Sequence, residues 1–220
     1  MSQLNVEQAR FNMVQQQIRP WEVLDQQVLD YMAEVPREAF VPAAYKNLAF
    51  ADIDIPLSHG QVMMSPKLEG RLLQSAMLQP TDRVLEIGTG SGYFTALLAK
   101  CANHVETIDI FEDLINEAEK NLSAFQIKNV TLNTGDAISD WKTDICYDLI
   151  VFTGSLPVLL SHFQQQLTIN GRLLAIVGED PIMEAQLITR VSEHEFLQDS
   201  LFETSVPSLI GAPVPSKFIW

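Results

Sequence analysis

The sequence contains no apolar run close to the ~20 residues that a membrane-spanning helix needs. Its first residues, MSQLNVEQARFNMVQQQ, lack the charged start and the apolar stretch of a secretory signal. Basic side chains are also few, because 14 Lys and Arg stand against 28 Asp and Glu, giving a formal net charge of -14. Binding to nucleic acid or anionic lipid depends on clustered Lys and Arg. We therefore expect neither partner, and the predicted location is the cytoplasm.

Cysteine is almost absent. The two cysteines, Cys101 and Cys146, form no CxxC motif and have no His pair nearby. We therefore expect neither a disulfide framework nor a metal site, and we predict that both residues are buried, reduced thiols.

The 220 residues, 47% of them apolar, provide enough material for a single domain with a sizeable core. Three parts are expected within this domain. Residues 1–66 hold N-terminal helices and an irregular substrate loop, 67–178 form a cofactor-binding α/β core, and 179–220 form antiparallel strands. In the first part, Asp25 is predicted to cap a helix, and Pro20 to end the helix before it.

Strand-like and helix-like segments alternate through the middle of the chain. Strands are predicted at residues 83–87, 104–110, 129–133, 147–153 and 171–178, and helices from 66 onward and at 93–101, 113–124 and 157–167. This alternation predicts an α/β fold with a doubly wound, mostly parallel sheet of Rossmann-like type. Short strand candidates at 186–191, 201–206 and 216–220 leave little room for helices, so we expect an antiparallel C-terminal edge.

The sharpest local motif follows the first predicted strand of the α/β core. Three glycines at alternate positions, Gly88, Gly90 and Gly92, precede a predicted helix, and Thr89 lies among them. Such a loop lets the backbone approach a ligand closely and aims helix N–H groups at it. A dinucleotide fingerprint would need its third glycine one residue later, where Tyr93 stands.

Three acids are placed to serve a nucleoside ligand. Asp109 ends the next strand, 21 residues after Gly88, where its carboxylate would accept hydrogen bonds from ribose hydroxyls. Asp136, followed by Ala137, comes after the third strand and would either accept a hydrogen bond from an adenine amino group or form a turn. Glu86 precedes the glycines and would repel a pyrophosphate but suit a cation; the alternative is a solvated strand-end charge.

Together these features resemble the cofactor site of class I S-adenosylmethionine-dependent methyltransferases. Further segments narrow the resemblance to one family, the protein-L-isoaspartate O-methyltransferases. The segments that are similar to this family in order and spacing are VPRE at 35–38, FVP at 40–42, AFAD at 49–52, IPL at 55–57, HGQ at 59–61 and LEIGTGSGY at 85–93. The similarity reaches VPSL at 206–209. It implies S-adenosylmethionine as cofactor and methyl transfer to the free carboxylate of L-isoaspartyl residues in damaged proteins.

One stretch departs from the family pattern. The family's substrate loop reads GxGQTISxP, with the Thr and Ser hydroxyls at the reaction centre, whereas this chain reads SHGQVMMSP over residues 58–66. Val62 replaces the Thr and Met64 replaces the Ser. Two alternatives therefore stay open: a methyltransferase of the same fold with a different, small and apolar acceptor, or a catalytically silent protein that binds S-adenosylmethionine.

The resemblance also places residues of this loop at the acceptor. Met64 stands at the catalytic position of the family serine, although without its hydroxyl. Ser65 is either a substitute hydroxyl or, as its place before a proline favours, the N-cap of the following helix. The candidates for substrate binding are His59, Gln61, Val62 and Met63. Of these, His59 has no acid paired with it in the sequence, and its alternative role is structural.

Overall fold

A seven-stranded sheet forms the centre of the molecule, which we describe from a computed structural model covering residues 3–139, 141 and 143–213. Its strands lie in the order β5-β4-β3-β6-β7-β8-β9. The first five of these are parallel, and β8 and β9 extend the sheet in antiparallel fashion. In chain order the strands are β3 (Arg83–Ile87), β4 (His104–Asp109), β5 (Val130–Thr134), β6 (Tyr147–Leu156), β7 (Leu167–Glu179), β8 (Ile182–Arg190) and β9 (Phe196–Thr204). The predicted fold class and the antiparallel C-terminal edge are confirmed.

Two apolar clusters cover the two faces of the sheet, because successive strand residues point to opposite faces. On β3, Val84 packs toward the larger cluster, while Leu85 and Ile87 pack toward the smaller one. The larger cluster contains buried residues of α4 (Pro66–Ala76) and α5 (Tyr93–Cys101) and Leu122 of α6 (Glu112–Ala124). The smaller cluster is covered by the short helix α7 (Ser161–Gln165) and by residues around Ile138.

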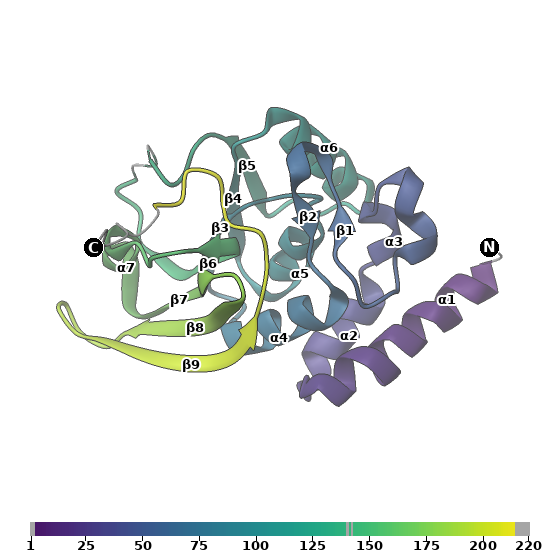
Figure 1. Cartoon of the computed structure of the whole chain (residues 1–220), viewed down its shortest axis with the longest axis horizontal. Coiled ribbons are helices and arrows are strands. Elements are labelled where there is room, and N and C mark those ends of the chain that lie inside the picture. Colours follow the sequence, from purple (N-terminus) through teal and green to yellow (C-terminus); the bar gives the residue numbers. More distant parts are fainter. Residues whose placement is uncertain (1–2, 140, 142, 214–220) are drawn as a thin grey trace.

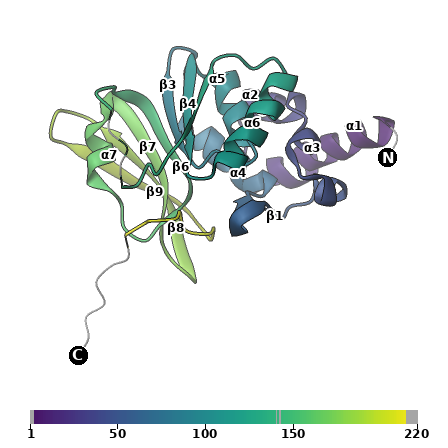
Figure 2. The same ribbon diagram turned by 90° about the horizontal axis from the view of Figure 1, so that it is seen from above.

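The N-terminal part adds helices to the side of the larger cluster. These are α1 (Gln3–Asn12), which continues as a π-helical segment (Met13–Ile18) and a 3-10 turn (Arg19–Trp21), then α2 (Gln26–Glu34), α3 (Arg37–Phe40) and a 3-10 segment (Ala43–Leu48). Asp25 caps α2 as predicted, since its carboxylate accepts hydrogen bonds from the N–H groups of Gln27 and Val28. Figure 1 and Figure 2 show α1 at one flank of the molecule and β8 and β9 at the other.

A short hairpin connects these helices to α4. Its strands β1 (Ile55–Pro56) and β2 (Val62–Met63) pair antiparallel, and a 3-10 turn (Ser58–Gly60) lies between them. The stretch that the sequence indicated only as an irregular loop is therefore ordered.

Several predictions about single segments were wrong. The helix expected at 157–167 is only α7, and β7 begins at Leu167, four residues before the expected start of that strand. Strand β6 continues past the expected end at 153 to Leu156, where it still pairs with β7. Strands β8 and β9 are longer than expected, and the strand expected at 216–220 lies outside the described residues. Both cysteines are free thiols, as predicted, but Cys101 is only partly buried and Cys146 is exposed.

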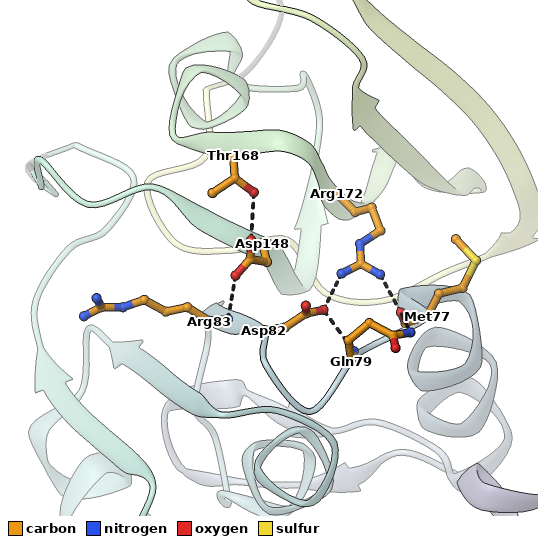
Figure 3. Close-up of polar contacts among 7 residues, drawn as sticks. All are labelled: Met77, Gln79, Asp82, Arg83, Asp148, Thr168 and Arg172. Carbon is orange, nitrogen blue, oxygen red and sulfur yellow. Dashed lines mark hydrogen bonds and ion pairs between the residues drawn. The ribbon is translucent and has the colours of Figure 1, made fainter.

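The amino-terminal edge of the sheet is held by two carboxylates (Figure 3). Asp148 on β6 accepts hydrogen bonds from the Arg83 N–H at 2.9 Å and from the Thr168 hydroxyl at 2.8 Å. Asp82 forms an ion pair with Arg172, whose guanidinium also donates to the carbonyl oxygen of Met77 at the end of α4, at 2.5 Å. These contacts join β3, β6, β7 and α4 at the edge opposite the glycine loop.

Within the described part of the chain, no helix has the length and apolar character to cross a membrane.

Candidate functional site

The sheet has a topological switch point between β3 and β6, since β4 and β5 lie on one side of that boundary and β7 on the other. Ligands of open α/β sheets bind at the carboxyl ends of the strands at such a point. Thr153 on β6 spans it by donating a hydrogen bond to the carbonyl oxygen of Gly88 at 2.6 Å. Two adjoining cavities open at this edge and share part of their lining, namely Gln61, Gly88, Asp109 and Leu209. We refer to the two together as the cleft.

The glycine loop forms the floor of the cleft. Gly88, Gly90 and Gly92 all have positive φ angles, of 100°, 54° and 81°, which residues with a Cβ rarely adopt. A Cβ on Gly88 would also lie 2.2 Å from the Thr153 hydroxyl oxygen. Gly88, Thr89 and Gly90 line the first cavity, and α5 begins directly after Gly92. The predicted combination of strand, glycine loop and helix is therefore present.

Asp109 lies at the end of β4 and lines both cavities. Its side chain is 7% exposed, and its oxygens accept hydrogen bonds from the N–H groups of Gly90 at 2.9 Å and Phe111 at 3.1 Å. Burial raises the pKa of this carboxyl, and the two backbone N–H groups oppose that rise. The carboxylate thus fixes the glycine loop against β4 while it lines the cleft.

Asp136 and Ala137 line the second cavity, next to Asp109. Asp136 accepts hydrogen bonds from the N–H groups of Ile138 and Ser139 and from the Ser139 hydroxyl, which lowers the pKa of its carboxyl. Asp136 therefore forms a turn, one of the two roles that the sequence left open, and it also lines the second cavity; the hydrogen bond with an adenine amino group stays a prediction.

Glu86 lies beneath the glycine loop, outside the lining of either cavity. The alternative of a solvated strand-end charge is wrong, because its side chain is fully buried. The carboxylate accepts hydrogen bonds from the hydroxyls of Thr95 at 2.5 Å and Thr107 at 2.7 Å, and Thr107 also bonds the Thr89 hydroxyl at 2.7 Å. Burial raises the pKa of Glu86 to about 8, although both hydroxyls oppose it. A chain of hydrogen bonds through Thr107 and Thr89 thus connects Glu86 to the cleft.

The hairpin covers the first cavity. Its residues Gln61, Val62, Met63 and Met64 line that cavity opposite the glycine loop, and both methionines are 4% exposed. Four of the loop residues that the resemblance placed at the acceptor are thus brought to the cleft, and three of them are apolar.

Ser65 and His59 lie outside the lining of the cleft. Ser65 holds the N-cap position of α4, but its side chain makes no capping hydrogen bond, contrary to our expectation. Instead its N–H donates to Asp54 at 2.8 Å, and its side chain faces a neighbouring cavity beside Lys67. His59 does have an acid partner, since its Nε2 lies 2.8 Å from Asp113 and its ring stacks on Phe111.

The residues of the first cavity that sequence reasoning missed include Glu69 and Phe94. Glu69 is 1% exposed and forms an ion pair with the fully buried Arg37. Burial raises the pKa of Glu69, and the Arg37 guanidinium opposes the rise. A signal was available, because Glu69 shares the buried stripe of its helix with Leu72, Leu73 and Ala76. An acid on such a stripe is costly unless it is paired, so it points to a partner or a ligand.

A family model described as Protein-L-isoaspartate(D-aspartate) O-methyltransferase matches residues 8–209 of this chain. The chain belongs to this family. A protein-L-isoaspartate O-methyltransferase 1 of Rhodopseudomonas palustris (strain HaA2) is 37% identical over 92% of this chain and 83% of its own length. The protein-L-isoaspartate O-methyltransferase of Protochlamydia amoebophila is also 37% identical, over 83% of this chain and 86% of its own.

Solved structures of protein-L-isoaspartate O-methyltransferases share the fold. One from Plasmodium falciparum, determined in complex with S-adenosyl-L-homocysteine, superposes with a TM-score of 0.78 at 21% identity, covering 91% of this chain and 97% of its own. A second gives a TM-score of 0.77 at 21% identity, over 92% of this chain and 66% of its own.

S-adenosylmethionine is the methyl donor of the family, and the residues of the cleft fit its chemistry. The charged residues that line the first cavity, Glu69 and Asp109, are both acids, and no Lys or Arg is among the described residues of that lining. A sulfonium with an ammonium group suits such a site, whereas a pyrophosphate does not. Across the described residues, no group of three His, Cys, Asp or Glu side chains is arranged to hold a metal ion.

Proposed function

We propose that this protein transfers a methyl group from S-adenosylmethionine to the free carboxylate of L-isoaspartyl residues in damaged proteins. The observation that carries the proposal is the position of the hairpin. In a chain of this family, the segment that corresponds to the substrate loop closes over the glycine loop, so one cavity joins the two. We propose the cytoplasm as the place where the reaction occurs.

In this proposal, Gly88, Thr89 and Gly90 hold the cofactor by their backbone, while Asp109 accepts hydrogen bonds from its ribose. Gly92, which was predicted to bind the cofactor, lies outside the lining of either cavity and packs against Ala118 of α6. Asp136 and Ala137 hold its adenine. Glu86 supports the loop through its bonds to Thr95 and Thr107. The cofactor, when bound, supplies a methyl group on a positively charged sulfur, which makes that carbon an electrophile.

The residues of this chain have no proton to remove, because the acceptor carboxylate is already ionised at pH 7. Their tasks are to align that carboxylate with the methyl group and to keep water away. Met63 and Met64 are nearly fully buried and suit the second task. Alignment is the weaker point, since Val62 and Met64 have no hydroxyl to donate. A hydrogen bond to a charged group contributes about 1.5–3 kcal/mol, so each missing bond lowers the rate by about ten- to a hundredfold.

A second candidate function follows from the same lining. Val62, Met63, Met64, Phe94 and Leu209 make the acceptor side of the cavity apolar. The second candidate is therefore a methyltransferase of the same fold that acts on a small apolar acceptor.

One experiment separates these functions. Labelled S-adenosylmethionine is supplied with an isoaspartyl peptide and, in parallel, with its normal aspartyl twin, while calorimetry measures cofactor binding. Base-labile label in the isoaspartyl peptide alone supports the proposal. Cofactor binding without label transfer favours the second candidate or a catalytically silent binding protein, and the absence of cofactor binding contradicts all three.

A further inference from the structure

Arg37, on α3, is a fully buried arginine that pairs with the cavity residue Glu69. All three nitrogens of its guanidinium have partners. Nε donates to the carbonyl oxygen of Ala49 at 3.0 Å, one terminal nitrogen donates to that of Met64 at 2.6 Å, and the other pairs with Glu69. A planar guanidinium presents its donors in a fixed fork, so these three partners are held in one fixed geometry.

Two of these partners flank residues 50–63, a segment that holds the hairpin and most of the substrate loop at 58–66. Ala49 immediately precedes this segment and Met64 immediately follows it, and the segment contains β1, the 3-10 turn and β2. Arg37 therefore fastens both ends of this segment with a single side chain. Because its bonds go to backbone carbonyl oxygens, they fix the path of the chain whatever side chains the loop carries.

The same guanidinium also connects the loop to the two other walls of the cleft. Its third partner, Glu69, belongs to α4 and lines the first cavity. Its central carbon lies 5.0 Å from the ring centroid of Tyr93, the first residue of α5 directly after the glycine loop. Arg37 thus lies where the substrate loop, α4 and the start of α5 meet.

We propose that Arg37 is a positioning residue for methyl transfer, which holds the substrate loop over the glycine loop. The inference rests on the proposed function, because it assigns a task in that reaction. A displacement of the reacting groups by about 1 Å costs on the order of a hundredfold in rate. Loss of Arg37 should therefore lower kcat/KM for the acceptor while cofactor affinity changes little.

The test compares a variant that keeps all three hydrogen bonds of Arg37 with a variant that removes both members of the ion pair. In Glu69→Gln, the amide oxygen still accepts from Arg37, which keeps its bonds to Ala49 and Met64. In Arg37→Met with Glu69→Gln, the pair is neutral and those bonds are absent, and neutral replacement of a buried ion pair is generally tolerated. Arg10→Met is the matched control, since Arg10 pairs with Glu38, next to Arg37 in the sequence, without contacting the loop.

Three quantities are measured on the folded variants: methylation kinetics with the isoaspartyl peptide, cofactor affinity by calorimetry, and amide hydrogen exchange of residues 50–63 with S-adenosylhomocysteine bound. We expect the double variant to lose about ten- to a hundredfold in kcat/KM relative to Glu69→Gln. Exchange in the loop should rise by about tenfold, from the loss of two bonds to a charged donor. Cofactor affinity should stay within about threefold, and Arg10→Met should match the wild type.

The proposal is overturned if the double variant equals Glu69→Gln in both kinetics and loop exchange. If the double variant does not fold, Arg37→Lys is measured instead, because lysine keeps the charge but cannot reach three partners at once. Wild-type kinetics and wild-type loop exchange in Arg37→Lys would also overturn the proposal. If the wild-type protein does not methylate the isoaspartyl peptide, that result contradicts the proposed function but does not contradict the role of Arg37 in holding the loop. Loop exchange, which needs no acceptor, then still decides the role of Arg37.

Discussion

At the scale of single residues, the acids of the cleft differ in what they contact. Asp109 and Asp136 line the cavities as the sequence predicted, but each also accepts hydrogen bonds from neighbouring backbone N–H groups. Glu86 is bonded to two threonine hydroxyls and acts from below the loop. The types and order of these residues were visible in the sequence. The direction of each carboxylate was not, because it depends on partners from other strands and helices.

Asp109→Asn tests the contact predicted between this residue and the cofactor. The amide offers one acceptor oxygen where the carboxylate has two, so a bond to Gly90, to Phe111 or to the ribose is lost. We expect S-adenosylmethionine to bind about ten- to a hundredfold more weakly, as measured by calorimetry. Glu112→Gln, an exposed acid at the start of α6, should bind like the wild type. Unchanged affinity in Asp109→Asn would place the cofactor elsewhere.

Glu86→Gln tests the buried charge beneath the glycine loop. Its pKa lies near 8 in the folded protein, against 4.5 for the ordinary residue, so the native state binds this proton more tightly than the unfolded chain does. The stability that protonation provides is complete below about pH 4.5 and is lost as the pH rises to about 8. The Tm of the wild type relative to Glu86→Gln should therefore fall between about pH 5 and pH 9. A constant difference would mean that Glu86 has an ordinary pKa.

Met64→Ser asks whether the missing family hydroxyl limits methylation of isoaspartyl residues. A serine there adds a donor to the acceptor side of the cavity. If the carboxylate is the acceptor, kcat/KM for the isoaspartyl peptide should rise by about tenfold or more. Met63→Ser makes the same chemical change one residue away and should not raise it. A fall in kcat/KM with Met64→Ser would favour the apolar acceptor.

At the scale of elements, strands and helices with a strong local pattern were predicted best. Strands β3 and β4, and helices α5 and α6, lie close to the predicted residues because glycines, charges and apolar spacing mark their ends. The full length of β6 escaped prediction because pairing with β7 determines where it ends. The hairpin β1–β2 escaped because each of its strands has only two residues, too few to show a periodic pattern. The Arg37–Glu69 pair joins residues 32 positions apart, and no local pattern reports such a contact.

The hairpin is attached to the start of α6 by His59 and Ser58, which both bond Asp113. The hydrogen bond from His59 is the main cause that lowers the pKa of Asp113. Gln61, two residues after His59, lines both cavities. The contacts with Asp113 therefore hold in place the part of the hairpin that lies over the cleft. The pair is solvent-exposed, so its effect should be small.

In His59→Ala, S-adenosylhomocysteine should dissociate about two- to fivefold faster, because the hairpin loses its contact between His59 and Asp113. Stopped-flow displacement measures this rate. Lys120→Ala removes a different exposed ion pair, with Glu117 on the same helix, and should leave the rate unchanged. An unchanged rate in His59→Ala would mean that the hairpin does not limit release.

At the scale of the whole molecule, the carboxyl ends of the strands form the cleft, whereas the amino ends hold contacts that join the strands. The glycine loop, the hairpin and Leu209 meet at the carboxyl edge, where the segment after β9 returns and pairs with Ser155 on β6. The amino edge carries the contacts of Asp82 and Asp148, which join three strands and α4 without touching the cleft (Figure 3). Substitutions at the amino edge should therefore change stability and leave cofactor binding intact.

Asp148→Ala is the test of this division. The substitution removes hydrogen bonds from the Arg83 N–H and the Thr168 hydroxyl and leaves a part-buried N–H without its acceptor. We expect the free energy of unfolding to fall by about 1.5–3 kcal/mol, as measured by urea denaturation. Asp199→Ala, at an exposed position on β9, should change it by less than about 0.5 kcal/mol. Affinity for S-adenosylmethionine should equal that of the wild type, because the folded variant keeps every residue of the cleft. A loss of affinity in folded Asp148→Ala would show that the two edges are coupled through β3 and β6.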